Sequence, residues 1–525
     1  MKKRIFLSSV LLLLTACELT DVDELEDKKD SDSTNNTATT SYVSPSGDND
    51  ADGSSDTPWK TIQFAVNQLE EDSTLIIKEG IYNERVFLSG DEDSNIVLEA
   101  ETGAVIDGSN LNVIGQQGLI TISNAHDIVV NNLELRNFKT ATGVNIPETP
   151  IGILINGTSY DINITNNIIH NIENLSTCGE SSGCAVGANG IAVYGDTKTA
   201  MTNLNFVNNE ISHCILASSE AFTINGNVDG FKVLNNYVHD NNNIGIVMIG
   251  YESDVCPKCL DEENRARNGI VKNNRSINNS TNLALGVFNN NPWYEGKDGS
   301  AGGFYVDGGH HILLEGNYAS QNDLGFEFAS EHAGKASSDV LMVNNYVYNN
   351  REVGLSLGGY SQNPTKAGGG DSNNIMVYNN SFYKNAGWGS EITFSYRVKN
   401  TTIANNIIYG EGAVADNFSE EANSQSKNIT WAKNLWWAKD TSDTSDIKGE
   451  SIVLDPLYVD APKGDLDLNS TSPAINEAIE QSAITWSGSF WENEFKDGII
   501  PASGSNDIRG EQRIKESLDM GADEV

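Results

Sequence analysis

Ten short segments of the chain, each ending in Asn-Asn or a close variant of it, restrict the fold more than any other feature. They include "IVVNNLEL", "FKVLNNYV" and "VLMVNNYV". The last residue of the pair falls at Asn132, Asn167, Asn209, Asn236, Asn274, Asn317, Asn345, Asn380, Asn406 and Asn434. Successive spacings are 35, 42, 27, 38, 43, 28, 35, 26 and 28 residues. The shortest spacings cluster, which indicates one small unit that insertions sometimes lengthen.

Each unit alternates apolar and polar residues, which predicts strands rather than helices. A second strand per unit is visible in "GILIN", "GFYVD" and "GFEFA". Units this small cannot bury an apolar face alone, so they must stack into a solenoid. Asparagine suits the corners of such a solenoid, because it tolerates left-handed backbone and its amide can bond along the stack.

With these repeats the chain resembles the right-handed parallel β-helix proteins of the pectate-lyase-like superfamily. The resemblance covers residues 42–525. It implies an all-β fold, a single-stranded right-handed parallel β-helix with a short capping helix from about Trp59 and loop insertions that form a cleft. It also implies activity on carbohydrates, although a fold alone does not fix the chemistry.

The first 17 residues predict an export signal. They have a basic start, an apolar run too short to span a bilayer, and the ending "LTAC", which resembles a bacterial lipobox with Cys17 as the lipidated residue. Residues 18–41 are acidic and then rich in Ser, Thr and Asn, which predicts a flexible tether. Glu18 follows the cysteine where an inner-membrane lipoprotein has Asp. We therefore expect a monomer at the outer membrane or cell surface, touching the membrane only through its lipid.

The net charge of −40 excludes a nucleic-acid binder, because no basic patch is present to replace phosphate counterions. In an exported protein the cysteines predict two disulfides that each close a loop, Cys178–Cys184 and Cys256–Cys259. Cys214 then has no partner. A zinc site built from the two pairs and a redox Cys-x-x-Cys are the rival hypotheses.

Alignment of the second strands places Asp307 and Glu327 on the outward face of adjacent coils. Strand spacings put their Cα atoms roughly 8 Å apart. Such a pair suits glycosidic cleavage, in which one carboxyl group protonates the leaving oxygen and the other attacks the sugar or activates water. Further acid, base or contact candidates are Glu331, His332 and Glu391. The alternatives are a calcium site and plain surface acidity; no motif specifies a metal or cofactor, but Ca²⁺ could bind here.

Long insertions after the second strands predict loops that flank this face. Aromatic side chains on them, and polar groups on the strands, are candidates for binding sugar rings. The candidate substrate-binding residues are Asn225, Tyr251, Trp293, Tyr294, Tyr305, Tyr360 and Trp388.

Three function classes remain open from the sequence. The first is a glycoside hydrolase that uses the carboxylate pair on a poly- or oligosaccharide. The second is a polysaccharide lyase or uronate epimerase, which needs a base near C5 and a cation on the carboxylate. The available bases are Lys297, Lys335, Lys366, Arg397, Tyr305 and His332. The third is a non-catalytic surface protein that binds carbohydrate or acts as an adhesin.

Overall fold

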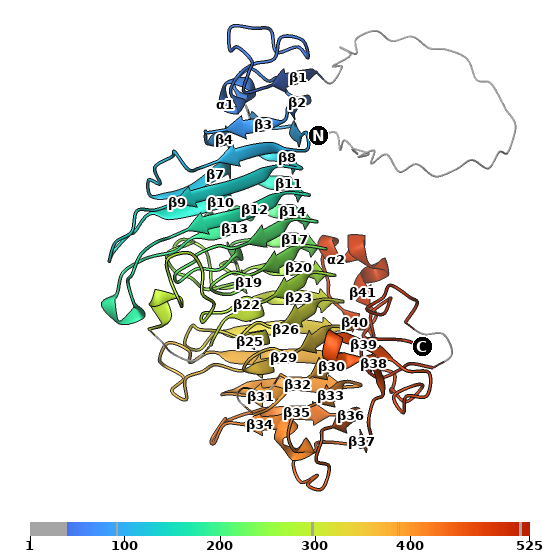
Figure 1. The fold of residues 1–525 in the computed structure, drawn as a ribbon. Helices are drawn as coiled ribbons and strands as arrows, with labels where there is room; N and C mark the ends of the chain where they lie inside the picture. Colours follow the sequence, from blue (N-terminus) through green and yellow to red (C-terminus); the bar gives the residue numbers. More distant parts are fainter. Residues whose placement is uncertain (1–38, 91–92, 296–298, 386, 388, 514–516) are drawn as a thin grey trace, which may run out of the picture. The chain divides into compact units, whose positions relative to one another are not determined.

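The computed structural model describes residues 39–525, apart from 91–92, 296–298, 386, 388 and 514–516. This part of the chain is a right-handed parallel β-helix, which confirms the predicted fold class (Figure 1). The export signal, Cys17 and most of the tether lie outside the described residues. Strand β1 begins at Thr40, two residues before the predicted start of the folded region.

Three long parallel sheets run along the stack. The β1 sheet contains β1 (Thr40–Val43), β2 (Ser73–Ile77), β5 (Ile96–Ala100), β8 (His126–Asn131), β11 (Tyr160–Thr165), β14 (Thr202–Val207), β17 (Asp229–Leu234), β20 (Arg267–Lys272), β23 (His310–Glu315), β26 (Ala336–Val343), β29 (Asp371–Tyr378), β32 (Val398–Ala404) and β35 (Lys427–Trp431). The β3 sheet contains β3 (Gly80–Tyr82), β6 (Ala104–Asp107), β9 (Glu134–Lys139), β12 (Ile168–Glu173), β15 (Glu210–Ser212), β18 (Tyr237–His239), β21 (Arg275–Ile277), β24 (Tyr318–Ser320), β27 (Tyr346–Tyr348), β30 (Ser381–Tyr383), β33 (Ile407–Tyr409), β36 (Asn434–Trp437) and β37 (Ser451–Val453).

The third sheet holds the second strands and is called the groove sheet below. It contains β4 (Val86–Ser89), β7 (Gln116–Ser123), β10 (Thr149–Asn156), β13 (Asn189–Gly195), β16 (Phe222–Gly226), β19 (Ile246–Ile249), β22 (Gly302–Asp307), β25 (Leu324–Ala329), β28 (Val353–Leu357), β31 (Ile392–Phe394) and β34 (Phe418–Glu420). Each coil runs from the groove sheet to the β1 sheet and then to the β3 sheet, and inward Ile, Val, Leu and Phe side chains of all three form one core.

The asparagine pairs form the corner between the β1 and β3 sheets. The first residue of a pair takes a positive φ, 56° at Asn166 and 57° at Asn235, where asparagine is tolerated. The second residue is buried, and its backbone N–H and amide both donate to the amide oxygen of the next coil, as from Asn317 to Asn345 at 2.8 and 3.0 Å. The ladder begins one coil later than predicted, at Asn167. Asn132, the first predicted member, occupies the corner position (φ 63°) and not the ladder position.

A second asparagine ladder, not predicted from the sequence, follows the β3 sheet. Its members are Asn241, Asn279, Asn322, Asn350 and Asn385. Both ladders are present in the coils from Asn241 to Asn385, so buried hydrogen bonds at two corners fix the strand register there in addition to packing.

A five-residue helix, α1 (Ile62–Val66), covers the first coil, as the sequence predicts. Its side chains Ile62, Ala65 and Val66 are buried against the core. The carboxylate of Glu84 accepts hydrogen bonds from the Ile62 and Gln63 N–H groups, each at 2.9 Å, and so satisfies two donors of the first helical turn.

The C-terminal segment returns along the outside of the stack (Figure 1). Two small antiparallel pairs, β38 (Tyr458–Asp460) with β39 (Asp465–Leu468) and β40 (Ile484–Thr485) with β41 (Ile499–Ile500), lie in it together with α2 (Ser489–Glu494). Its apolar side chains pack on the outer faces of the β1 and β3 sheets. The groove sheet is covered by loops instead. No helix among the described residues has the length and apolar character needed to cross a membrane.

Candidate active site

Two carboxyl residues lie on adjacent strands of the groove sheet, as the sequence predicts. Tyr305 of β22 pairs with Glu327 of β25, and Asp307 pairs with Ala329. Asp307 and Glu327 are therefore one coil and two positions apart. The next strand places Ser356 beside Glu327, and this small side chain keeps the neighbouring space open.

The sequence predicts that the outward face of these strands is open to solvent. In the structure, loops cover this face. Asp307 and Tyr305 are each 4% exposed, and Val247 is 1% exposed. Tyr305 and Val247 belong to a small apolar cluster outside the main core. The face is therefore a partly dry groove, in which charged groups are costly and proton affinities shift.

Burial in this groove raises the proton affinity of both acids. Burial, reinforced by Glu331, raises the pKa of Glu327 to about 8. Burial also raises the pKa of Asp307 well above its usual range, with further contributions from Glu331 and Glu252. One hydrogen bond opposes this shift, because the Glu331 N–H donates to Asp307 Oδ1 at 2.8 Å.

The turn after β25 brings Glu331 and His332 to the same place. Glu331 reaches solvent, yet loss of water in the loop-lined groove, followed by the charge of Glu252, raises its pKa. His332 Nε2 lies 3.3 Å from Glu252 Oε1, and this contact raises the pKa of His332. Both predicted residues thus join the Asp307–Glu327 group.

Two acids of this groove were not predicted from the sequence. Glu252 follows β19, and Glu220 precedes β16. Burial raises the pKa of Glu220 to about 7, with contributions from Glu331 and Glu252, while Thr223 Oγ1 donates to its carboxylate at 2.8 Å. Their positions in the sequence could have indicated them, since each lies within three residues of a groove-sheet strand.

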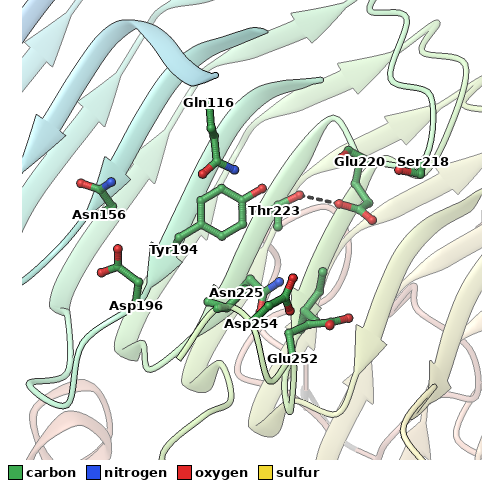
Figure 2. Close-up of a pocket in the computed structure, with 13 residues that line it drawn as sticks. Gln116, Asn156, Tyr194, Asp196, Ser218, Glu220, Thr223, Asn225, Glu252 and Asp254 are labelled. Atoms are coloured by element: carbon green, nitrogen blue, oxygen red, sulfur yellow. Dashed lines mark hydrogen bonds between the residues drawn. The ribbon is translucent and has the colours of Figure 1, made fainter. Parts of the chain in front are cut away.

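A cavity of about 630 Å³ extends from this acid group along β7, β10, β13, β16 and β19. Figure 2 shows Tyr194 and Thr223 on its floor and the carboxyl groups of Glu220, Glu252 and Asp254 around it. Asn225, predicted to bind substrate, lines this cavity. Glu252 lines this cavity and also lies 3.3 Å from His332, so the cavity and the Asp307–Glu327 group are neighbours.

The predicted aromatic contacts divide into two groups. Tyr360 is 58% exposed, and burial of its hydroxyl and the nearby Glu331 raise its pKa to about 12. Tyr294 hydrogen-bonds Asn243 Oδ1 at 3.1 Å, and its raised pKa, due first to burial, also reflects Glu220 and Glu331. Both residues therefore lie near the acids, as does Tyr305.

Two other predicted aromatic side chains pack within the loops. Tyr251 packs on Gly308 and lies 4.9 Å from the Arg265 guanidinium, which makes it part of the loop structure. Trp293 packs with Cys178, Val186 and Ala217 under the disulfide loop. Trp388 lies outside the described residues.

Glu391 does not lie on the groove face, so this part of the prediction is wrong. Thr393, not Glu391, pairs with Ser356. The Glu391 carboxylate is fully buried and accepts hydrogen bonds from the Asn385 N–H at 2.8 Å and the Asn385 amide at 2.7 Å. It terminates the second asparagine ladder.

Both predicted disulfides, Cys178–Cys184 and Cys256–Cys259, are present. Cys214 is free and buried, and burial raises the pKa of its thiol to about 12. The Cys178–Cys184 loop meets the loop before β22, since Ser181 Oγ donates to Glu295 Oε1 at 2.6 Å. The disulfides therefore hold loops that line the sides of the groove.

The basic residues near the groove are engaged elsewhere. Lys335 pairs with Asp261. The Arg397 Nε lies 3.1 Å from Asp371 Oδ1, and its guanidinium also donates to loop carbonyls. Lys366 is exposed on a loop, and Lys297 lies outside the described residues. In the described part of the chain, the one group with metal-ligand spacing is His310, His311 and Asp339, on the β1 sheet and not in the groove.

The fold and groove define a parallel β-helix protein with a carboxyl-rich groove on one sheet. The chain belongs to the family of YwoF from Bacillus subtilis (strain 168), an uncharacterized protein to which it is 34% identical over 461 residues, covering 82% of this chain and 91% of YwoF. It is 40% identical over 76 residues to pectate lyase PEL9 of Emericella nidulans, a match to 13% of this chain and 18% of that enzyme.

No family model matches the chain. Among solved structures, a GH136 lacto-N-biosidase from Eubacterium ramulus is similar at a TM-score of 0.47 and 14% identity, covering 79% of this chain and 68% of that one. Pectate lyase Pel9A is similar at a TM-score of 0.39 and 14% identity, covering 93% and 96%.

Proposed function

We propose that the groove cleaves a glycosidic bond of a poly- or oligosaccharide, with Glu327 as the general acid. The observation that carries this proposal is the Glu327 pKa of about 8, next to two other carboxyl groups. At neutral pH Glu327 holds a proton and can give it to the leaving oxygen, which is the role of a raised-pKa carboxyl in glycosidases.

Asp307 and Glu331 supply the second catalytic group, which acts as the nucleophile or the general base. The charge of Glu331 raises the pKa of Asp307, so the two carboxyl groups titrate as an interacting pair of which one member ionises first. The ionised carboxylate attacks the anomeric carbon or removes a proton from the attacking water. The Glu331 N–H holds Asp307 Oδ1 in place for that task. Tyr360, exposed beside the acids, offers a ring face to a sugar.

A second candidate is a polysaccharide lyase or epimerase, which the local likeness to pectate lyase PEL9 favours. That reaction needs a free base and a cation to neutralise the uronate. Pairing of Lys335 with Asp261 and of Arg397 with Asp371, together with the acidic lining, weighs against it. A non-catalytic surface binder is the third candidate.

The test is a screen of neutral, amino and uronic polysaccharides, with two readouts. Hydrolysis releases reducing ends without ultraviolet absorbance, whereas a lyase also makes an absorbing unsaturated uronate. We expect reducing ends alone. Glu327→Gln and Asp307→Asn keep shape but remove the ionisable group, and each should lower kcat by about 10²–10⁴-fold. Near-full turnover by both variants rules out this assignment.

We also propose that the mature protein is anchored through a lipid on Cys17 at the outer membrane or cell surface. The support is the "LTAC" ending of the export signal and the tether that follows. Labelled palmitate should enter the wild-type protein expressed in a Gram-negative host but not Cys17→Ser. Equal labelling of both rejects the anchor.

A further inference from the structure

The cavity beside Asp307 and Glu327 has an acidic lining. Four carboxyl residues contribute to it, Asp196, Glu220, Glu252 and Asp254, while none of its lining residues is Lys, Arg or His. Figure 2 shows Asp196, Glu220, Glu252 and Asp254 around the cavity. A bound glycan would therefore meet an acidic lining with no basic lining residue facing it.

The cavity also contains hydrogen-bond acceptors that lack donors. Asn225 is 6% exposed, and its Oδ1 has no hydrogen-bond partner; the Oδ1 of Asn156 has none either. Both side chains line the cavity. A buried acceptor without a donor is costly, so these atoms call for a ligand rich in N–H and O–H groups.

We propose that this cavity binds a sugar residue with a free, protonated amine, so that the preferred glycan contains unacetylated hexosamine. The inference rests on the proposed function, because it takes the cavity as a subsite of the glycan that reaches Asp307 and Glu327. An ammonium group supplies three donors and a positive charge, which matches both the carboxylates and the unpaired amide oxygens.

The same lining excludes the common acidic glycans. A uronate would place its carboxylate among four carboxyl residues, and contact with those that are ionised costs binding free energy. An N-acetylated residue is neutral and loses the charge-assisted bonds while keeping the hydroxyl groups. The Tyr194 ring, on the floor of the cavity, offers a surface for the apolar face of the sugar.

Glu252 links the subsite to the cleavage site. Its carboxylate contacts His332 at 3.3 Å on the catalytic side and lines the cavity on the other. The strands β16, β19 and β22 are consecutive in the groove sheet, so the amine-bearing residue sits within two coils of Asp307. The subsite thus selects the sugar next to the scissile bond.

The experiment is calorimetric titration of the full folded chain carrying Glu327→Gln, which slows turnover. The probes are the tetrasaccharides of glucosamine, N-acetylglucosamine and galacturonic acid. We expect glucosamine to bind at least about tenfold more tightly than its acetylated form, to weaken as salt rises, and the uronate not to bind. Adding Glu220→Gln or Asn225→Ala should each weaken glucosamine binding about tenfold. Glu71→Gln, an exposed acid on the N-terminal coils, should change nothing.

Several results overturn the proposal: uronate binding equal to or tighter than glucosamine, no preference for the free amine, no binding of any probe, or unchanged affinity in both cavity variants. Circular dichroism of each variant shows that it is folded. Failure of the proposed function is separate. Amine binding without cleavage of any glycan rejects the function and keeps the subsite, whereas cleavage of a uronic polymer without amine binding rejects the subsite.

Discussion

Replacing one ladder asparagine tests what holds the coils together. The Asn317 side chain is fully buried and makes four hydrogen bonds. Its amide donates to Val271 O at 2.9 Å and Asn345 Oδ1 at 3.0 Å, and its oxygen accepts from the N–H and the amide of Asn274 at 2.9 and 3.0 Å. Asn317→Ala removes all four bonds. The buried Asn274 N–H loses its acceptor, whereas the Asn274 amide keeps Val233 O and Asn345 Oδ1 keeps the backbone N–H of residue 317.

The expected loss follows from these bonds. At about 1 kcal/mol of net stability for each, Asn317→Ala lowers the free energy of unfolding by about 4 kcal/mol. A matched control is Asn163→Ala, on the outward, half-buried face of β11, where about 0.5 kcal/mol or less is expected.

Urea denaturation, followed by circular dichroism, measures both variants. The midpoint of Asn317→Ala should fall clearly while that of the control stays near wild type, and the dependence on urea should be unchanged. A loss below about 1 kcal/mol for Asn317→Ala would show that core packing alone sets the register.

Three further results are expected. Activity should decline as pH rises through about 8, because Glu327 loses its proton there, and Glu327→Gln should lack this limb; a flat profile in wild type contradicts the assignment. Glu327 and Glu391 have pKa values of about 8 when folded and ordinary values near 4.5 when unfolded, so their contribution to stability is full below about 4.5 and is lost as pH rises through about 8. The Glu327→Gln/Glu391→Gln variant should show a shallower fall of melting temperature over that window. Reducing the disulfides should lower activity while leaving the melting temperature nearly unchanged, because the disulfides hold the groove loops and not the core. A lower melting temperature with unchanged activity argues against a role in the groove.

The strand register could be predicted because alternating residues identify the inward face. This reasoning placed Asp307 and Glu327 correctly relative to each other. It failed at Glu391, because alignment on Gly389 shifted the segment by two positions relative to Ser356. The sequence signal that was missed is the second row of asparagines, which ends at Asn385 and whose next acceptor is Glu391.

The covering of the groove could not be predicted from local patterns. Ser181 and Glu295 meet although they are 114 residues apart, and such contacts decide which strand residues are shielded. Asp307 therefore looked exposed in the sequence and is buried in the fold. The raised proton affinities of Glu220 and Glu327 depend on the same loops, so their chemistry becomes visible only with the structure.

One measurement addresses the role of Glu327 as proton donor most directly. Once the cleaved sugar is known, Glu327→Gln is compared with wild type on the oligosaccharide and on a dinitrophenyl glycoside of the same sugar, whose leaving group needs no proton. The general-acid role predicts a loss of about 10²–10⁴-fold in kcat/KM on the oligosaccharide and a far smaller loss on the activated glycoside. Equal losses on both substrates would contradict proton donation by Glu327.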